Sequence, residues 1–287
     1  MDSAGKAGGH LPVRAGIGLR DPHHRQLLEE LPAVAWLEVH SENFFAAGGE
    51  PLRILEAVRR HYPLSLHGVG MSLGSSDELS ERHLRKLKNL VERIEPAAIS
   101  EHLCWSSVNG RFLNDLLPLP YTAEALSHIS GRVARMQDFL GRNIMVENVS
   151  SYVRFAGAEF QEWEFLAELS RRTGCKILLD VNNIHVSAAN HGFDAMAYLR
   201  GIPRDAVGEI HLAGYAEVDD FLVDTHSRPV QNVVWRLYAK ALQRFGPVAT
   251  LIEWDNDIPP LAILLAEADK ADRQLRSIAA SRHALAA

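Results

Sequence analysis

The sequence alternates eight short runs rich in strand-forming residues with eight longer stretches of helical periodicity. Strands are expected near residues 15–19, 36–40, 64–67, 99–102, 144–147, 177–180, 209–211 and 250–253. Helices are expected near residues 24–31, 51–62, 79–94, 123–140, 162–172, 193–199, 230–245 and 261–278. Because parallel strands need a crossover that a helix supplies, this alternation predicts one parallel sheet.

Eight strand-helix units in a chain of 287 residues match the size of a closed (β/α)8 TIM barrel. A doubly wound open sheet is the alternative, and it would be expected to carry a phosphate-binding glycine fingerprint after an early strand. Gly68, Gly70 and Gly74 do not form one. The hypothesis is a single barrel domain over 15–280 with tails at 1–14 and 281–287, and the insertion 106–120 is expected to be an ordered lid.

Composition limits the classes of partner and location. No apolar run approaches the roughly 18 residues that cross a bilayer, so we expect no membrane span. The formal charge of −6 gives no basic footprint for nucleic acid, which favours small molecules or proteins as partners. Residues 1–14 lack the apolar stretch of a secretory signal, and the only two cysteines, Cys104 and Cys175, fit a reducing compartment. A cytoplasmic location is therefore expected.

The last residues of the expected strands are nearly all potential metal ligands. In a barrel of this kind, the C-terminal strand ends converge on the active site. These ends carry His40, His67, Glu101-His102, Glu147-Asn148, Asp180, His211 and Glu253. Two expected loops extend the set, Asp180 to Asn183 after the sixth strand and Asp224 to His226 after the seventh.

Taken singly, each of these groups is ordinarily a solvated or hydrogen-bonded rim residue. Taken together, the carboxylates repel and raise one another's pKa, so their convergence requires cations. These carboxylates are Glu147, Asp180, Asp224 and Glu253. Interleaved imidazoles favour zinc, iron or manganese over magnesium or calcium. About nine candidate side chains exceed the four to six donors of one ion, so more than one ion is expected.

Other polar residues near the rim have weaker signals. Glu38, His40, Glu42 and Asn43 surround the second strand end, where substrate binding and a rim hydrogen-bond network are equally open. Glu101 has the same two possibilities. Asn148 faces away from Glu147 on an extended strand, so it is expected to support the ligands. Cys104 is favoured as a buried structural thiol, and whether Cys104 or His185 takes part is left open.

Nine short stretches carry a resemblance to a known family. They lie at 16–20, 37–43, 65–70, 100–103, 146–152, 179–183, 209–214, 224–226 and 251–254, and include Leu37-Glu38-Val39-His40-Ser41-Glu42-Asn43 and Asp224-Thr225-His226. Over residues 16 to about 260 the chain resembles the multinuclear non-haem iron-dependent oxidases related to methanobactin-biosynthesis protein B.

The resemblance implies a barrel that holds two or three iron ions and uses dioxygen to oxidise a cysteine of a ribosomally made precursor peptide. It also implies a separate partner protein that presents the peptide. The negative charge and the lack of a long apolar run, by contrast, are what predict no nucleic-acid or membrane partner. The metal ligands that it implies are His67, His102, Glu147, Asp180, Asn183, His211, Asp224, His226 and Glu253. No catalytic residue beyond these ligands is implied.

The wider fold also resembles the xylose-isomerase-like barrels of trinuclear-zinc endonucleases and sugar isomerases. An Asp-x-x-His after the sixth strand would favour zinc, whereas this chain has Asp180 followed by Asn183 three residues later. An amide oxygen is a harder, weaker donor than imidazole, which favours iron. A zinc-dependent hydrolase or isomerase, and a non-catalytic metal-binding or interaction scaffold, are the alternatives.

Overall fold

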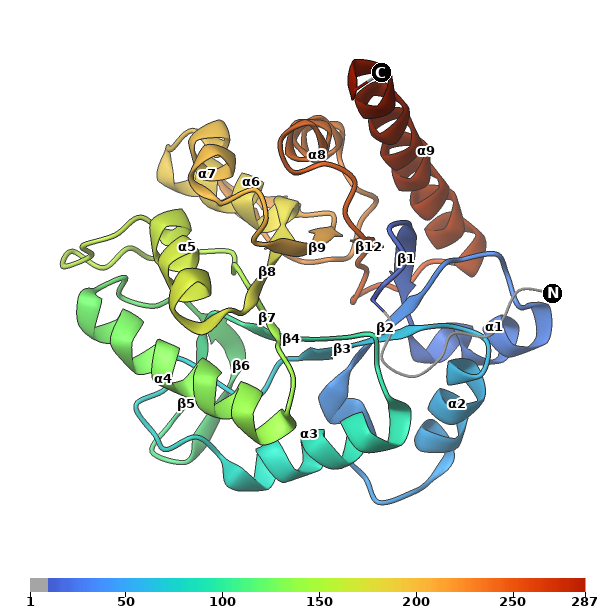
Figure 1. The fold of residues 1–287 in the computed structure, drawn as a ribbon, viewed down its shortest axis with the longest axis horizontal. Helices are drawn as coiled ribbons and strands as arrows, with labels where there is room; N and C mark the ends of the chain where they lie inside the picture. The colour runs from blue at the N-terminus through green and yellow to red at the C-terminus, as the bar shows by residue number, and fades with distance from the viewer. Residues whose placement is uncertain (1–9, 287) are drawn as a thin grey trace.

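The computed structural model describes residues 10–286, in which eight parallel strands close into a barrel inside a ring of helices (Figure 1). The barrel strands are β1 (Ala15–Gly18), β2 (Leu37–His40), β3 (Leu64–Gly68), β4 (Ala98–His102), β7 (Met145–Glu147), β8 (Lys176–Asp180), β9 (Val207–Leu212) and β12 (Thr250–Ile252). Each pairs in parallel with the next, and β12 pairs with β1. The predicted closed barrel is therefore confirmed, and the open sheet is excluded.

The eight expected helices are present, and all but the last have both ends close to those expected. They are α1 (His24–Glu30), α2 (Glu50–Arg59), α3 (Glu81–Ile94), α4 (Ala123–Leu140), α5 (Glu162–Thr173), α7 (Ala195–Gly201), α8 (Asn232–Phe245) and α9 (Leu261–Ala286). Side-chain caps explain several starts: the oxygens of Ser80 and Thr122 accept hydrogen bonds from backbone N–H groups of α3 and α4. Gly141 ends α4 at φ 71°, a left-handed conformation that glycine adopts without strain.

Two ends of the chain differ from the expectation. Helix α9 continues to Ala286, through most of the expected tail 281–287, because its last residues contain no proline or glycine to stop it. Residues 1–9 of the expected N-terminal tail, and residue 287, lie outside the described residues.

Helix α6 (Val181–His191) is a correction, because a loop was predicted at Asp180 to Asn183. Asp180 is the N-cap of this helix, and its side chain accepts a hydrogen bond from the Asn183 N–H at 2.5 Å. The helix was missed because its sequence is rich in asparagine and histidine, which are weak helix formers. Asn183 is therefore oriented by the first helical turn.

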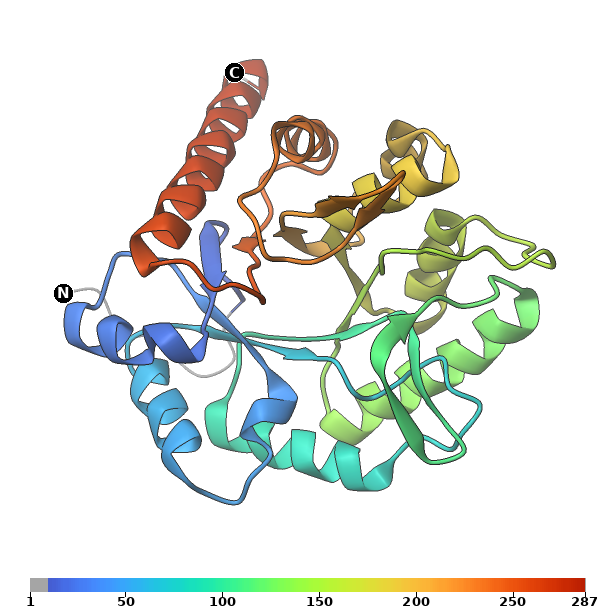
Figure 2. The same ribbon diagram turned by 180° about the vertical axis from the view of Figure 1, so that it is seen from behind.

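Two hairpins follow barrel strands and stand at the front in Figure 2. The segment expected as an ordered lid forms β5 (Trp105–Val108) and β6 (Arg111–Leu117), joined by Asn109 and Gly110 at φ 51° and 70°. Positive φ at both turn residues is the geometry of a tight hairpin, and Asn-Gly favours it. The second hairpin pairs β10 (Ala216–Val218) with β11 (Phe221–Val223).

The described part of the chain has no helix long and apolar enough to cross a membrane. Most buried side chains are apolar, and they pack where the strands meet the surrounding helices. Inside the barrel, below the rim, two carboxylates are 0% exposed, Glu38 on β2 and Glu209 on β9. Buried charges of this kind require a partner or a counter-charge, and both lie next to the rim histidine His211.

Candidate metal centre

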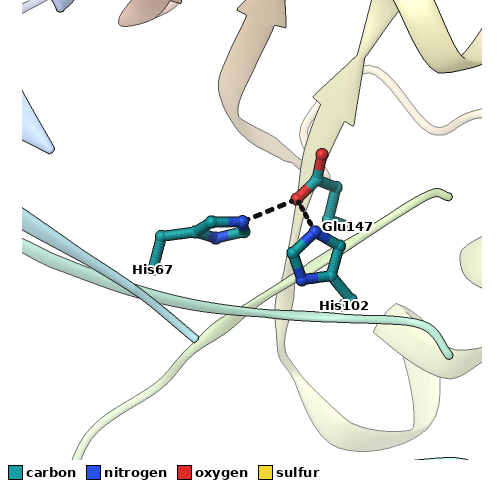
Figure 3. A group of neighbouring side chains, drawn as sticks. All are labelled: His67, His102 and Glu147. Carbon is teal, nitrogen blue, oxygen red and sulfur yellow. Dashed lines mark ion pairs between the residues drawn. The ribbon is translucent and has the colours of Figure 1, made fainter. Parts of the chain in front are cut away.

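The first group of converging side chains comes from three neighbouring strands (Figure 3). His67 lies near the end of β3, His102 ends β4 and Glu147 ends β7, and all three are buried. The Glu147 Oε2 atom lies 3.2 Å from the Nε2 atoms of both His67 and His102. One carboxylate oxygen thus faces two imidazole nitrogens.

A hydrogen bond to one ring nitrogen of His102 shows which of its two nitrogens is available to bind a metal ion. Its Nδ1 atom lies 2.9 Å from the carbonyl oxygen of Gly68, which can only accept, so Nδ1 carries the hydrogen. Burial lowers the pKa of His102, which keeps the ring neutral. Its Nε2 lone pair therefore faces the Glu147 oxygen. Two electron pairs this close repel unless a cation lies between them.

The second group lies deeper and contains three carboxylates. Glu147, Asp180, His211 and Glu253 place one ligand atom each within 4.8 Å of the others. The His211 Nδ1 atom is 3.1 Å from Glu253 Oε2 and 3.8 Å from Glu147 Oε1. Glu147 therefore takes part in both groups. Burial and the Glu147 carboxylate raise the pKa of Asp180 well above its ordinary value, as expected where negative charge lacks compensation.

The third group joins the loop after β11 to the end of β12. The His226 Nε2 atom lies 2.7 Å from Asp224 Oδ1, and its Nδ1 atom lies 3.4 Å from Glu253 Oε2. His226 has φ 47°, a left-handed conformation that costs of order 1–3 kcal/mol for most residues other than glycine. The strained backbone turns the ring toward the cavity. Asp224 is held by Ser150 and Asn182, whose side chains donate hydrogen bonds at 3.1 and 2.7 Å.

The chemistry of the unpaired atoms fits metal ions. Among the described residues, five buried ligand-type atoms of the expected ligands form no hydrogen bond of ordinary geometry, although two of the imidazole nitrogens lie close to a carboxylate: His67 Nε2, Glu147 Oε2, Asp180 Oδ2, Asn183 Oδ1 and His226 Nε2. Buried polar atoms without partners are rare, because each costs about 1–3 kcal/mol. Cations bound in the three groups would satisfy all five.

The groups open into a cavity of about 220 Å³ at the C-terminal face of the barrel. Its walls include seven of the nine expected ligands, namely His67, His102, Glu147, Asn183, Asp224, His226 and Glu253. Asp180 and His211 do not line it, and both are fully buried in the second group. The β5–β6 hairpin adds Asp115 and Leu116 to the wall, so this insertion does border the cavity.

The residues expected to bind substrate or support the ligands do not all lie at the cavity. His40 lines the cavity, and burial together with the Arg20 guanidinium lowers its pKa to about 4. Asn43 is exposed and is not part of the cavity wall. Asn148 lies behind the ligands, where its side chain bonds to both the N–H and the carbonyl oxygen of Asp180 at 2.9 Å.

Glu42 and Glu101 hold the loop that follows His67 rather than facing the cavity. Glu42 accepts hydrogen bonds from the N–H groups of Val69 and Gly70 at 3.1 and 2.9 Å. Glu101 accepts one from the N–H of Met71 at 3.2 Å. Since Gly68 at the start of this loop bonds to His102, the two carboxylates stabilise the geometry of both histidines in the first group.

The two residues left open lie outside the cavity. His185 packs against Tyr215 with ring centroids 5.1 Å apart. Cys104 is 1% exposed, and burial raises the pKa of its thiol well above the ordinary value. A thiol with a raised pKa is a poor nucleophile, which fits a structural role.

Several residues around the centre were missed from the sequence. Glu209 lies 3.2 Å from the Nε2 atom of His211, and Asp255 lies 3.0 Å from the Nδ1 atom of His226. Glu209 precedes His211 by two residues on β9, so the alternation of a strand would have indicated it, whereas Asp255 lies beyond the end of β12 and had no such signal. Glu209 fixes the ring so that Nδ1 faces the second group, an arrangement common behind histidine ligands.

Eight parallel strands in a closed ring, with histidines and carboxylates gathered at the C-terminal rim, define a xylose-isomerase-like TIM barrel with side chains suited to metal ions. The chain belongs to the family described as RiPP precursor modification enzyme MbnB/TglH/ChrH, whose model matches residues 14–276. RiPP denotes a ribosomally made peptide that is modified after translation. The resemblance found in the sequence is thereby confirmed.

Individual relatives and solved structures are also similar to this chain. The chain is 55% identical to a UPF0276 protein of Anaeromyxobacter sp. (strain Fw109-5) over 256 residues, 89% of this chain and 90% of that protein. Endonuclease IV from Thermus thermophilus matches with TM-score 0.59 at 16% identity, over 93% of this chain and 99% of that chain. A D-psicose 3-epimerase from Clostridium cellulolyticum matches with TM-score 0.61 at 10% identity, over 92% and 99%. These two likenesses concern the fold alone.

Proposed function

We propose that this chain is an oxidase that holds two or three iron ions and uses dioxygen to modify a cysteine of a ribosomally made precursor peptide. Membership of a family of precursor-modifying enzymes supports the peptide substrate. The observation that carries the proposal is the set of buried ligand atoms without ordinary hydrogen bonds in three adjoining groups.

The donor set supports iron over zinc. Histidines and a carboxylate form the first group, carboxylates predominate in the second, and the amide oxygen of Asn183 lines the same cavity. Oxygen-rich sets with some imidazole suit iron, whereas zinc prefers nitrogen and sulfur donors in fewer positions. The nine residues expected from the sequence would hold the ions, with Glu147 and Glu253 shared between groups.

Iron with dioxygen as oxidant would supply the redox chemistry that imidazole, carboxylate and amide side chains lack. The residues of the chain itself orient the ligand side chains. The bonds from Glu209 and Gly68 fix the rings of His211 and His102, and Asn148 fixes Asp180. Val69 and Leu116 add apolar surface to the cavity wall. Because Cys104 is buried outside the wall, the proposed reactive thiol belongs to the peptide.

A presenting partner protein is the second part of the proposal. Apolar side chains are exposed around the rim on both hairpins and on the loop after β7; they are Phe112, Leu113, Tyr152, Val153, Phe155, Val218 and Phe221. Exposed apolar groups in one region are typical of surfaces that bind another protein or peptide. Tyr152 lines the metal cavity, and Phe112 and Leu113 stand on the same strand as wall residues Asp115 and Leu116, which supports delivery of a peptide to the metal centre.

The experiment captures the bound peptide under conditions in which it cannot be oxidised. A tagged, iron-loaded chain is incubated anaerobically with lysate of its native host, washed, and then exposed to air. We expect a small cysteine-containing peptide to be retained, with or without a presenting protein. Its mass should change only after dioxygen is admitted, and the change should map to the cysteine.

The control is the same capture with protein whose metal has been removed, which should leave the retained peptide unmodified. Modification that proceeds equally without dioxygen would contradict the oxidase. Recovery of nucleic acid or sugars in place of a peptide would favour the hydrolase or isomerase alternatives.

A further inference from the structure

A second pocket, of about 160 Å³, lies beside the metal cavity and shares a wall with it. The wall is the segment after β7: Ser150 and Tyr152 line the metal cavity, whereas Ser151 and Val153 line the second pocket. Alternate residues thus face opposite sides. Val153 is 54% exposed at this edge, so the pocket communicates with the rim.

The second pocket has an aromatic lining. Tyr121, Phe155, Phe160, Trp163 and Phe193 form much of its wall. Its volume is close to that of apolar cavities of about 150 Å³ that accept a benzene ring in other proteins. The pocket therefore has the size and chemistry for one aromatic or branched aliphatic side chain.

Helix α6 connects the two sites along one face. Asn183 lines the metal cavity, while Ser187 and His191, four and eight residues further on, line the second pocket. At a rise of about 1.5 Å per residue these positions span roughly 12 Å. The wall is fixed to this helix, since Ser187 accepts a hydrogen bond from the Ser151 N–H at 3.0 Å. An extended peptide advances about 3.3 Å per residue, so the span corresponds to about two to four residues.

We propose that this aromatic pocket receives an apolar side chain of the precursor peptide, about two to four residues from the one modified in the metal cavity. The inference rests on the proposed peptide substrate and adds to it a determinant of specificity. Transfer of an aromatic or branched side chain from water into such a pocket strengthens binding by about 10- to 100-fold.

The test uses metal-free full-length chain, so that binding is measured apart from catalysis. The probe is N-acetyl-4-fluorophenylalanine amide, followed by fluorine NMR, with N-acetylleucine amide as competitor. Ala158→Trp places an indole in the pocket that Ala158 lines, and Ile263→Trp adds the same group on the exposed surface of α9 as a control. We expect saturable, competable binding to wild type and to Ile263→Trp, weakened at least about tenfold in Ala158→Trp.

A second variant tests whether weaker binding could result from misfolding. Phe155→Glu places a charge at the exposed mouth of the aromatic pocket, and it should weaken probe binding similarly while the circular dichroism spectrum is unchanged. Binding equal to wild type in both pocket variants, or no saturable binding to wild type, would overturn the proposal. This outcome can be distinguished from failure of the proposed function. Probe binding without peptide modification would support the pocket proposal and contradict the proposed function. Peptide modification without probe binding would contradict the pocket proposal alone.

Discussion

Replacing Glu147 with glutamine is expected to remove metal from two groups at once and to lower kcat/KM by at least about 1000-fold. Its Oε2 atom faces His67 and His102 at 3.2 Å, and its Oε1 atom faces His211 at 3.8 Å. Glutamine keeps the volume of the side chain but replaces one of these oxygens with an NH2 group that cannot bind a cation. Loss of one ligand to a catalytic metal commonly removes several kcal/mol of transition-state stabilisation.

Metal content by mass spectrometry of the purified variant, together with turnover, measures this effect. Glu267→Gln on α9 is the matched control, because this half-buried carboxylate accepts a hydrogen bond from the Val230 N–H and does not line the cavity. The control should keep its metal and activity. A Glu147→Gln protein with the wild-type metal content would remove Glu147 from both groups.

His226→Gly is expected to lose one metal per chain and to reduce turnover at least about 100-fold, while the barrel still folds. Glycine accepts the left-handed backbone at φ 47°, so the substitution removes the imidazole without adding strain. Asp224 would lose its partner at 2.7 Å. The first group should keep its metal, because His67 and His102 come from other strands.

The matched control is Asp219→Gly, which changes another non-glycine residue of positive φ, 51°, at an exposed turn. If Asp224 and His226 formed only an exposed ion pair, worth about 0–1 kcal/mol, the His226 variant would behave like this control. Metal content and turnover indistinguishable between the two variants would therefore exclude the pair from the centre.

The barrel could be predicted from the sequence because its strands are short, apolar and separated by amphipathic helices. The same logic led to the metal centre, since in a barrel the last residue of each strand must face one rim. Helix α6 could not be predicted, because the aspartate that caps it was interpreted only as a ligand. A short polar side chain can serve both purposes, and sequence periodicity does not distinguish them.

Residues that reach the cavity from distant loops could not be predicted either. Asp115 comes from the β5–β6 hairpin, and the hydroxyl of Tyr152 accepts a hydrogen bond from the Asp224 N–H at 2.8 Å across 72 residues. Such contacts depend on how loops fold over the rim, which local patterns do not encode. The aromatic pocket was missed for the same reason, since its walls come from separate segments of the chain.

The metal itself tests the central claim most directly. Protein expressed in medium containing both iron and zinc, and purified without added metal, should be analysed for elements and by Mössbauer spectroscopy. The proposed function predicts more than one iron per chain, with a spectrum of neighbouring iron ions and peptide modification that depends on the iron. Stoichiometric zinc, with no activity gained on reconstitution with iron, would contradict it and favour the hydrolase or isomerase.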